Sequence, residues 1–158
     1  MTLLALFEWM QASWLGQTVH SSRWLFPLLE SAHLLALSLL GGTLLLVDLR
    51  MLGLLLPDQP IATLARGVQA WRTRSLAAMA MTGVPLLFSE AVKCYGIPAF
   101  WAKLAALPFA LAFLYAVRDP AALDERMVTG WRSRWIAVAS IALWFTVAAA
   151  GRWIGFSG

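Results

Sequence analysis

Four long apolar runs, each separated from the next by a charged or turn-forming stretch, make up most of this chain. A helix needs about 20 mainly apolar residues to cross the hydrocarbon core of a bilayer. The runs reach about that length, and they cover about residues 24–47, 76–95, 99–117 and 135–154. The pattern predicts an all-α integral membrane protein, a four-helix bundle that forms a single membrane domain over residues 1–158.

A shorter amphipathic segment precedes the first run. Its apolar residues recur at helical spacing: Leu3, Leu6, Phe7, Met10 and Trp14. Such spacing is typical of a helix that lies in the membrane interface with its apolar face toward the acyl chains. We therefore expect an N-terminal interfacial amphipathic helix over about residues 3–15 that does not cross the bilayer.

The connections between the runs carry turn signals. Pro57 and Pro60 interrupt the helical pattern, and the polar-faced segment 61–72 is then expected to lie on the membrane surface before the second span. Residues 96–98 form the tightest connection, so the second and third spans are predicted to be an antiparallel hairpin of neighbouring helices. Asp119 is expected to cap a short helix in the loop that follows the third span.

The positive charges predict the orientation. Of the twelve lysines and arginines, eight fall in the two loops that follow the first and third runs: Arg50, Arg66, Arg72, Arg74, Arg118, Arg126, Arg132 and Arg134. Loops rich in these residues stay on the cytoplasmic side. Both termini are then periplasmic, and the chain is expected to be a multi-pass protein of the bacterial inner (plasma) membrane.

Composition agrees with a lipid environment and excludes several classes. Hydrophobic residues make up 61% of the chain and charged residues 13%, whereas about a quarter of the residues of a soluble domain are charged. The net charge of +4 comes from basic residues at span ends, so we expect no nucleic-acid partner. A single cysteine excludes an intrachain disulfide and a zinc finger. Tryptophans near the expected membrane surfaces predict aromatic belts: Trp9, Trp14, Trp24, Trp101, Trp131, Trp135 and Trp153.

Ionisable residues remain inside the predicted spans: Glu30, His33, Glu90, Lys103 and Arg152. An ionisable group in a membrane is costly unless it has a partner or lines a cavity, so it marks a functional site by default. At a rise of about 1.5 Å per residue, the four charged residues lie at a similar depth in the outer half, and His33 lies near the midplane. The sequence thus predicts a polar site in the periplasmic half. The same charges could instead neutralise one another as a structural network.

A redox cofactor is the first interpretation of this site. Cytochromes of the b type hold haem between helices through histidine nitrogens. His33 is the candidate axial and metal ligand, while Lys103 and Arg152 would meet haem propionates or a quinone oxygen. His20, which precedes the first span, could supply the second ligand if its loop folds inward. The other candidates for that second ligand are Met79, Met81 and the His33 of a second copy. We expect haem b or quinone and a role in electron transfer.

Two other interpretations use the same chain. Glu30, His33 and Glu90 could pass a proton or hold a small solute, with Pro85 freeing a backbone carbonyl inside the second span. The chain could also be a structural subunit of a larger membrane complex. Beyond the lipid bilayer, we expect it to form homo-oligomers or to join such a complex. No catalytic residue is assigned, because Cys94 lacks a base and no serine lies in a nucleophile elbow.

Motifs of intramembrane charges and small residues extend over most of the chain. They are Glu30-x-x-His33, Gly41-Gly42 with Asp48-Leu49-Arg50 and Gly53, Phe100-x-x-Lys103 after Pro98, and Trp144 with Gly151-Arg152. This set resembles an uncharacterised bacterial family of small four-span membrane proteins, which implies the fold but no established activity. The chain is also distantly similar to the copper-resistance membrane domain and to four-helix b-type cytochromes. That similarity implies a redox or metal role by analogy.

Overall fold

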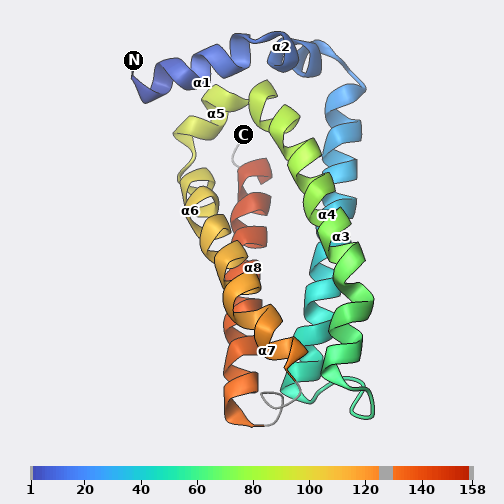
Figure 1. Ribbon diagram of the computed structural model, residues 1–158. Coiled ribbons are helices and arrows are strands. Elements are labelled where there is room, and N and C mark those ends of the chain that lie inside the picture. The colour runs from blue at the N-terminus through green and yellow to red at the C-terminus, as the bar shows by residue number, and fades with distance from the viewer. Residues whose placement is uncertain (1, 125–129, 157–158) are drawn as a thin grey trace.

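A computed structural model describes residues 2–124 and 130–156, and within these ranges the chain is helical with no β-strand. Four long helical segments lie side by side (Figure 1). They are α3 (Leu25–Leu52), α4 (Ile61–Ser89), the continuous segment of α6 (Pro98–Phe113), η1 (Leu114–Arg118) and α7 (Asp119–Leu123), and α8 (Trp131–Phe156). The helical bundle predicted from the apolar runs is therefore confirmed for the described residues. Arg126, predicted for the second basic loop, lies outside them.

Two short helices, α1 (Leu3–Ala12) and α2 (Trp14–Ser21), cross one end of the bundle (Figure 1). We call this the capped end, and the opposite end, where α7 lies, the α7 end. The sequence predicted one helix over residues 3–15, and Ser13 is the reason that there are two. Its backbone is extended, and its hydroxyl donates to Met10 O at 2.6 Å and accepts from Gly16 N at 3.2 Å. One side chain thus ends α1 and caps the start of α2.

The two crossing helices are attached to the bundle by close backbone contacts. A Cβ added at Gly16 would lie 2.7 Å from the carbonyl oxygens of both Gln11 and Phe88, so only glycine allows α2 to approach the end of α4 this closely. The Gln11 side chain accepts from Val92 N at 2.9 Å, at the start of α5 (Ala91–Gly96). These contacts fix α1 and α2 across the capped end.

Within the part of the chain that the structure describes, three segments are long and apolar enough to span a membrane: Leu25–Leu52, Pro98–Leu123 and Trp131–Phe156. The helix α4 does not belong to this set, because its first half carries several arginines. It is nevertheless one continuous helix of 29 residues, so the predicted separate surface segment over 61–72 is wrong. The predicted second span is also too long at its end, because the chain turns at Glu90 and continues as the short α5.

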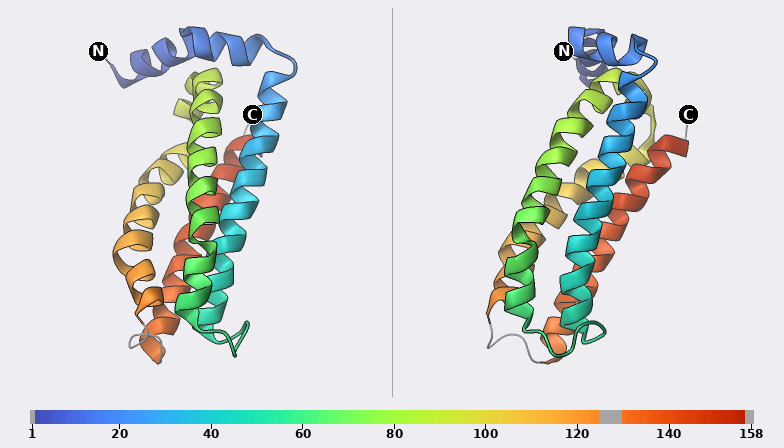
Figure 2. Two further views of the ribbon diagram at one scale, coloured as in Figure 1. Left: turned by 45° about the vertical axis from the view of Figure 1, so that its right-hand side comes forward. Right: turned by 90° about the vertical axis from the view of Figure 1, so that its right-hand side faces the viewer.

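The packing order of the long segments differs from the predicted one. The helix α4 packs mainly against α3, and α6 packs mainly against α8, which also contacts α3. The tight connection at residues 96–98 does not make α4 and α6 neighbours, because α5 separates them and they diverge toward the capped end (Figures 1 and 2). The continuous segment of α6, η1 and α7 contacts α4 mainly through α7.

Three apolar clusters follow one another along the bundle. Val47, Met51, Ile61 and the alanines 65, 121, 122 and 137 fill the α7 end. Leu40, Leu44 and Leu114 form the middle cluster, with Met79 and Trp144 packed against it. At the capped end, α1 places Phe7 against Tyr95, Phe100 and Trp101, with ring centroids 5.3 to 5.8 Å apart. Trp101 therefore belongs to an aromatic core, whereas the other tryptophans predicted for the belts are exposed.

Candidate functional site

His33 is held against α4 by polar contacts. Its Nδ1 lies 2.8 Å from Thr82 Oγ1, so α3 and α4 meet there through polar groups. The Thr82 hydroxyl has a single proton and donates it to Ala78 O, 2.7 Å away. The hydroxyl must then accept from His33 Nδ1–H, which leaves Nε2 of the neutral ring as the acceptor. The His33 ring also has a hydrogen-bonding interaction with the backbone of Met79.

Glycines make room for the two functional side chains at this level. A Cβ at Gly83 would lie 3.1 Å from His33 Cε1, and one at Gly151 would lie 3.3 Å from Lys103 Nζ. Lys103 on α6 thus lies against the backbone of α8, close enough for its charge to act on His33. All four long segments contribute to this group of residues, which we call the capped-end site: His33, Thr82, Gly83, Lys103 and Gly151.

The other predicted site residues lie outside this group. Glu30 and His20 are exposed. Glu90 lies at the break between α4 and α5 and pairs with Lys93 at 3.5 Å. Arg152 is exposed and lies over the Phe156 ring, 4.4 Å from its centroid. Within the described residues, the charges of Glu30, Glu90, Lys103 and Arg152 form no ion pair with one another, so the structural network expected from them is not formed.

The residues considered as a second metal ligand beside His33 differ in their exposure. Met79 packs against the middle cluster inside the bundle, whereas Met81 is 75% exposed. His20 ends α2 on the exposed side. Within the described chain, no group of three or more His, Cys, Asp and Glu side chains could hold a metal ion. Of the residues considered for a second ligand within one chain, Met79 is therefore the one that faces the interior.

A second polar group, at the α7 end, is buried more completely. Arg118 has 0% of its side chain exposed and donates from Nε to Asp48 Oδ1 at 2.9 Å. Its other two nitrogens donate to Asp119 Oδ1 at 3.0 Å and to Leu44 O at 3.1 Å. The second oxygen of Asp48 accepts from Ser140 at 2.7 Å. Three of the four long segments are thus joined by one arginine and one aspartate.

Arg72 adds the fourth segment to this group. It forms a two-point contact with Asp119, from NH1 to Oδ1 at 2.7 Å and from NH2 to Oδ2 at 2.6 Å. We call the five residues the α7-end network: Asp48, Arg72, Arg118, Asp119 and Ser140. Two arginines face two aspartates, so the formal charges cancel. Burying such charges is tolerable only when they are paired and hydrogen-bonded.

The sequence analysis placed Arg72, Arg118 and Asp119 in loops, and that placement is wrong, because all three lie on helices and their side chains pair with one another. Asp119 accepts from two arginines and is not a side-chain cap. A π-helical turn at η1, where Asp119 N donates to Leu114 O, adds a residue to the turn just before the network. The signal in the sequence was that Asp48 and Arg118 each directly continue an apolar run, with opposite charges at the same predicted membrane surface.

Comparison with known proteins adds a family. The family of unknown function DUF6644 matches the chain over residues 6–157. The chain belongs to DUF6644. No curated protein and no solved structure matches it. Membership confirms the expected uncharacterised family, while the similarity to cytochromes and to the copper-resistance domain stays a prediction.

In this DUF6644 chain, one more buried polar atom lies at the middle cluster. Trp144 Nε1 is buried and has no hydrogen-bond partner among the described residues, and its ring packs against the middle cluster. A buried N–H without a partner is uncommon in native proteins. The interior therefore holds a free donor on Trp144, an acceptor on His33 and an ammonium on Lys103.

Proposed function

We propose that this protein is a four-span, multi-pass protein of the bacterial inner membrane that binds a quinone ring at the capped-end site and takes part in electron transfer. One observation carries the proposal: Thr82 fixes the His33 tautomer so that Nε2 accepts, while Lys103 lies opposite on α6. A quinol hydroxyl needs an acceptor, and a quinone oxygen needs a donor. His33 and Lys103 supply one of each.

The route to the site agrees with a lipid-soluble ring. The helices α4 and α6 diverge at the capped end and pack mainly against other partners (Figure 2). Because these two helices pack mainly against other partners, we propose that a ring with a long apolar tail enters between them from the acyl-chain region.

The topology follows from the charges and the helix lengths. The helix α4 matches α3 in length and packs along it, so we place it across the membrane despite its arginines. The arginine-rich α7 end is then cytoplasmic and both termini are periplasmic. Reporter fusions test this: a periplasm-dependent reporter should be active at the C-terminus and inactive when inserted in the loop 53–60.

Haem b is the second candidate, and one contact favours it. A metal-bound histidine usually donates its other ring N–H to a nearby acceptor, as His33 Nδ1 does to Thr82. His33 would be one axial ligand, and Met79 fits the interior position for another. When bound, haem would supply one-electron chemistry. The chain itself would orient the imidazole and hold Lys103 as a positive charge nearby.

An optical spectrum and a quinone assay of the purified protein distinguish these candidates. A Soret band that shifts on dithionite reduction and is lost in His33→Ala would indicate haem. Quinone recovered by solvent extraction, or a saturable titration with a short-chain quinone, would indicate the first candidate, and His33→Ala should abolish it. Glu30→Gln, one turn away and exposed, is the matched control.

A colourless protein that neither retains nor binds quinone would contradict the redox proposal. Proton or small-solute movement, or a structural role in a larger membrane complex, would then take its place.

A further inference from the structure

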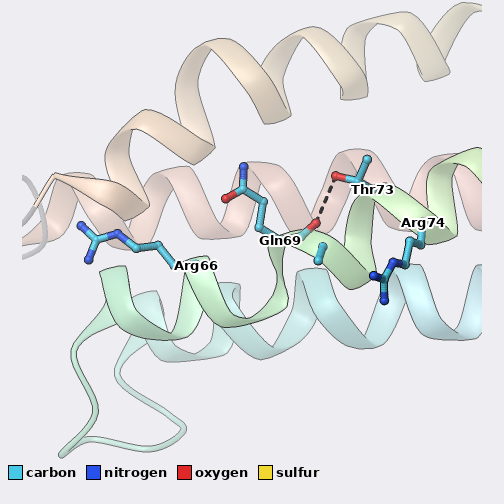
Figure 3. A pocket seen from close by; sticks show the side chains of 5 residues that line it. Arg66, Gln69, Thr73 and Arg74 are labelled. Carbon is cyan, nitrogen blue, oxygen red and sulfur yellow. Dashed lines mark hydrogen bonds between the residues drawn. The ribbon is translucent and has the colours of Figure 1, made fainter.

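The exposed face of α4 near the α7 end carries a row of basic and polar side chains. Arg66, Gln69, Ala70, Thr73 and Arg74 line an open depression of about 470 Å³. Figure 3 shows these side chains following one another along α4, with the two guanidinium groups at opposite ends. Within the described residues, neither arginine forms an ion pair.

Helical spacing explains how the depression arises. Arg66, Ala70 and Arg74 are each four residues apart and form one row, and Gln69 and Thr73 form the adjacent row. The arginines are separated by about 12 Å along the axis, with the small Ala70 between them. The two guanidinium groups lie apart in Figure 3, and rotation of these exposed side chains would bring both over that alanine toward one anionic group. Thr73 donates to the backbone oxygen of Gln69 at 3.0 Å, a bond that does not involve the Gln69 side-chain amide.

Aromatic residues place this face at the level of a membrane surface. Trp71 and Tyr115 are each 52% exposed and neighbour the arginines of α4, with Arg74 5.5 Å from the Trp71 ring and Arg72 5.7 Å from the Tyr115 ring. Tryptophan and tyrosine concentrate at the headgroup level of a bilayer. Basic residues at that level attract anionic lipids.

We propose that Arg66, Gln69 and Arg74 form a binding site for the phosphate of an anionic phospholipid headgroup on the cytoplasmic side. Two guanidinium groups and an amide supply donors, and Ala70 leaves the backbone surface open between them. The acyl chains of the lipid would follow the apolar surface of α4 toward the middle of the membrane. The proposal depends on the membrane placement given above and is independent of the quinone or haem site.

The test is thermal unfolding of the detergent-solubilised protein with added phosphatidylglycerol or phosphatidylcholine. Phosphatidylglycerol should raise the unfolding midpoint of the wild type in a saturable way, and phosphatidylcholine should not. In Arg66→Gln/Arg74→Gln, half-saturation should require on the order of tenfold more phosphatidylglycerol, because each basic residue near the surface contributes to the attraction. Both arginines are exposed, so the variant should keep its fold, and size-exclusion chromatography checks this.

The matched control is Arg23→Gln/Arg134→Gln, which removes the same charge from exposed positions elsewhere. It should keep the wild-type response. If the control loses its response to phosphatidylglycerol equally, the response comes from general charge attraction, and the proposed site is wrong. Inorganic phosphate at the same phosphate concentration should not stabilise the protein, and equal stabilisation would overturn the assignment to a lipid.

The outcomes also separate this proposal from the previous one. A protein recovered from the aqueous fraction after detergent-free lysis would contradict the membrane placement and both proposals. A membrane-integrated protein that binds quinone or haem but does not respond to phosphatidylglycerol would contradict the lipid site alone.

Discussion

The two ends of the bundle bury their polar side chains in different ways. At the α7 end, the guanidinium of Arg118 has three acceptors, and both oxygens of Asp48 have donors. At the capped end, His33 contacts only the Thr82 hydroxyl and the Met79 backbone through polar groups, and Lys103 lies against the glycine backbone of α8 without an acid partner among the described residues. Both groups connect several helices, but only the first uses most of its hydrogen-bonding capacity.

The difference is the one expected between a structural polar group and a polar group that binds a ligand. A network whose donors and acceptors are satisfied by the protein has few hydrogen-bonding groups left to bind a ligand. Its loss is strongly destabilising. A histidine and a lysine with capacity to spare stabilise the fold less and can bind something else. Nε of Arg72 is the exception at the α7 end, because it is buried without a hydrogen-bond partner in residues 2–124 and 130–156.

The largest effect is expected for Arg118→Met. The substitution leaves Asp48 buried without its cation, while Asp119 keeps Arg72, and removing one partner of a buried pair costs about 3–5 kcal/mol. Thermal unfolding in detergent and membrane yield should both fall sharply. The double variant Asp48→Asn/Arg118→Met should recover part of the loss, because it removes both charges. A single variant as stable as the wild type would show that the network does not support the fold.

A smaller loss is expected for Ser140→Ala. The second oxygen of Asp48 then lacks its donor inside the bundle, which costs about 1–3 kcal/mol for a buried group left unsatisfied. Thr146→Val removes a hydroxyl from the exposed side of the same helix and serves as the control. Equal unfolding midpoints for the two variants would contradict the importance of the Ser140 contact.

At the capped end, Thr82→Val should cost less than Ser140→Ala, about 0.5–1.5 kcal/mol for one neutral hydrogen bond. Its effect on ligand binding should be larger than its effect on stability, because the His33 tautomer is no longer fixed. Thr73→Val is the control in the absence of anionic lipid, because the Thr73 hydroxyl also bonds the carbonyl four residues earlier. If Thr82→Val binds the ligand as well as the wild type does, binding does not depend on a fixed His33 tautomer.

The smallest effect is expected for Glu30→Gln. Glu30 is exposed on α3, so removing its charge should change neither the unfolding midpoint nor quinone or haem binding. A loss of binding would instead restore Glu30 to the site, as the sequence analysis expected.

Much of the fold could be predicted, because helix length and apolar content are local properties. The apolar runs identified the cores of α3, α6 and α8, and amphipathic spacing identified the crossing N-terminal segment. The division of that segment at Ser13 and the continuity of α4 through its arginines were missed. The division follows from the local capping by Ser13, which the spacing of apolar residues does not reveal, and the continuity of α4 goes with the pairing of Arg72 with Asp119.

The candidate site could be predicted only in part. His33 and Lys103 were identified because an ionisable residue inside an apolar run is costly to place in a membrane without a partner or a cavity. Thr82, Gly83 and Gly151 were not, because small and weakly polar residues are ordinary in membrane helices until a neighbour is known. Glu30 and Arg152 were expected beside His33 at a similar depth, but depth along a helix does not determine which face a side chain occupies.

The sequence by itself determined that the chain is helical, where most of its long apolar segments lie, and which polar residues interrupt them. These properties depend on residues close together in the chain. Only the tertiary structure decided which helices are neighbours and which charges are paired, because those depend on rotation and packing of whole helices. Asp48 and Arg118 are 70 residues apart in sequence, yet they form a 2.9 Å contact in the interior. Glu30 and His33 share one turn of α3, yet they face different surroundings.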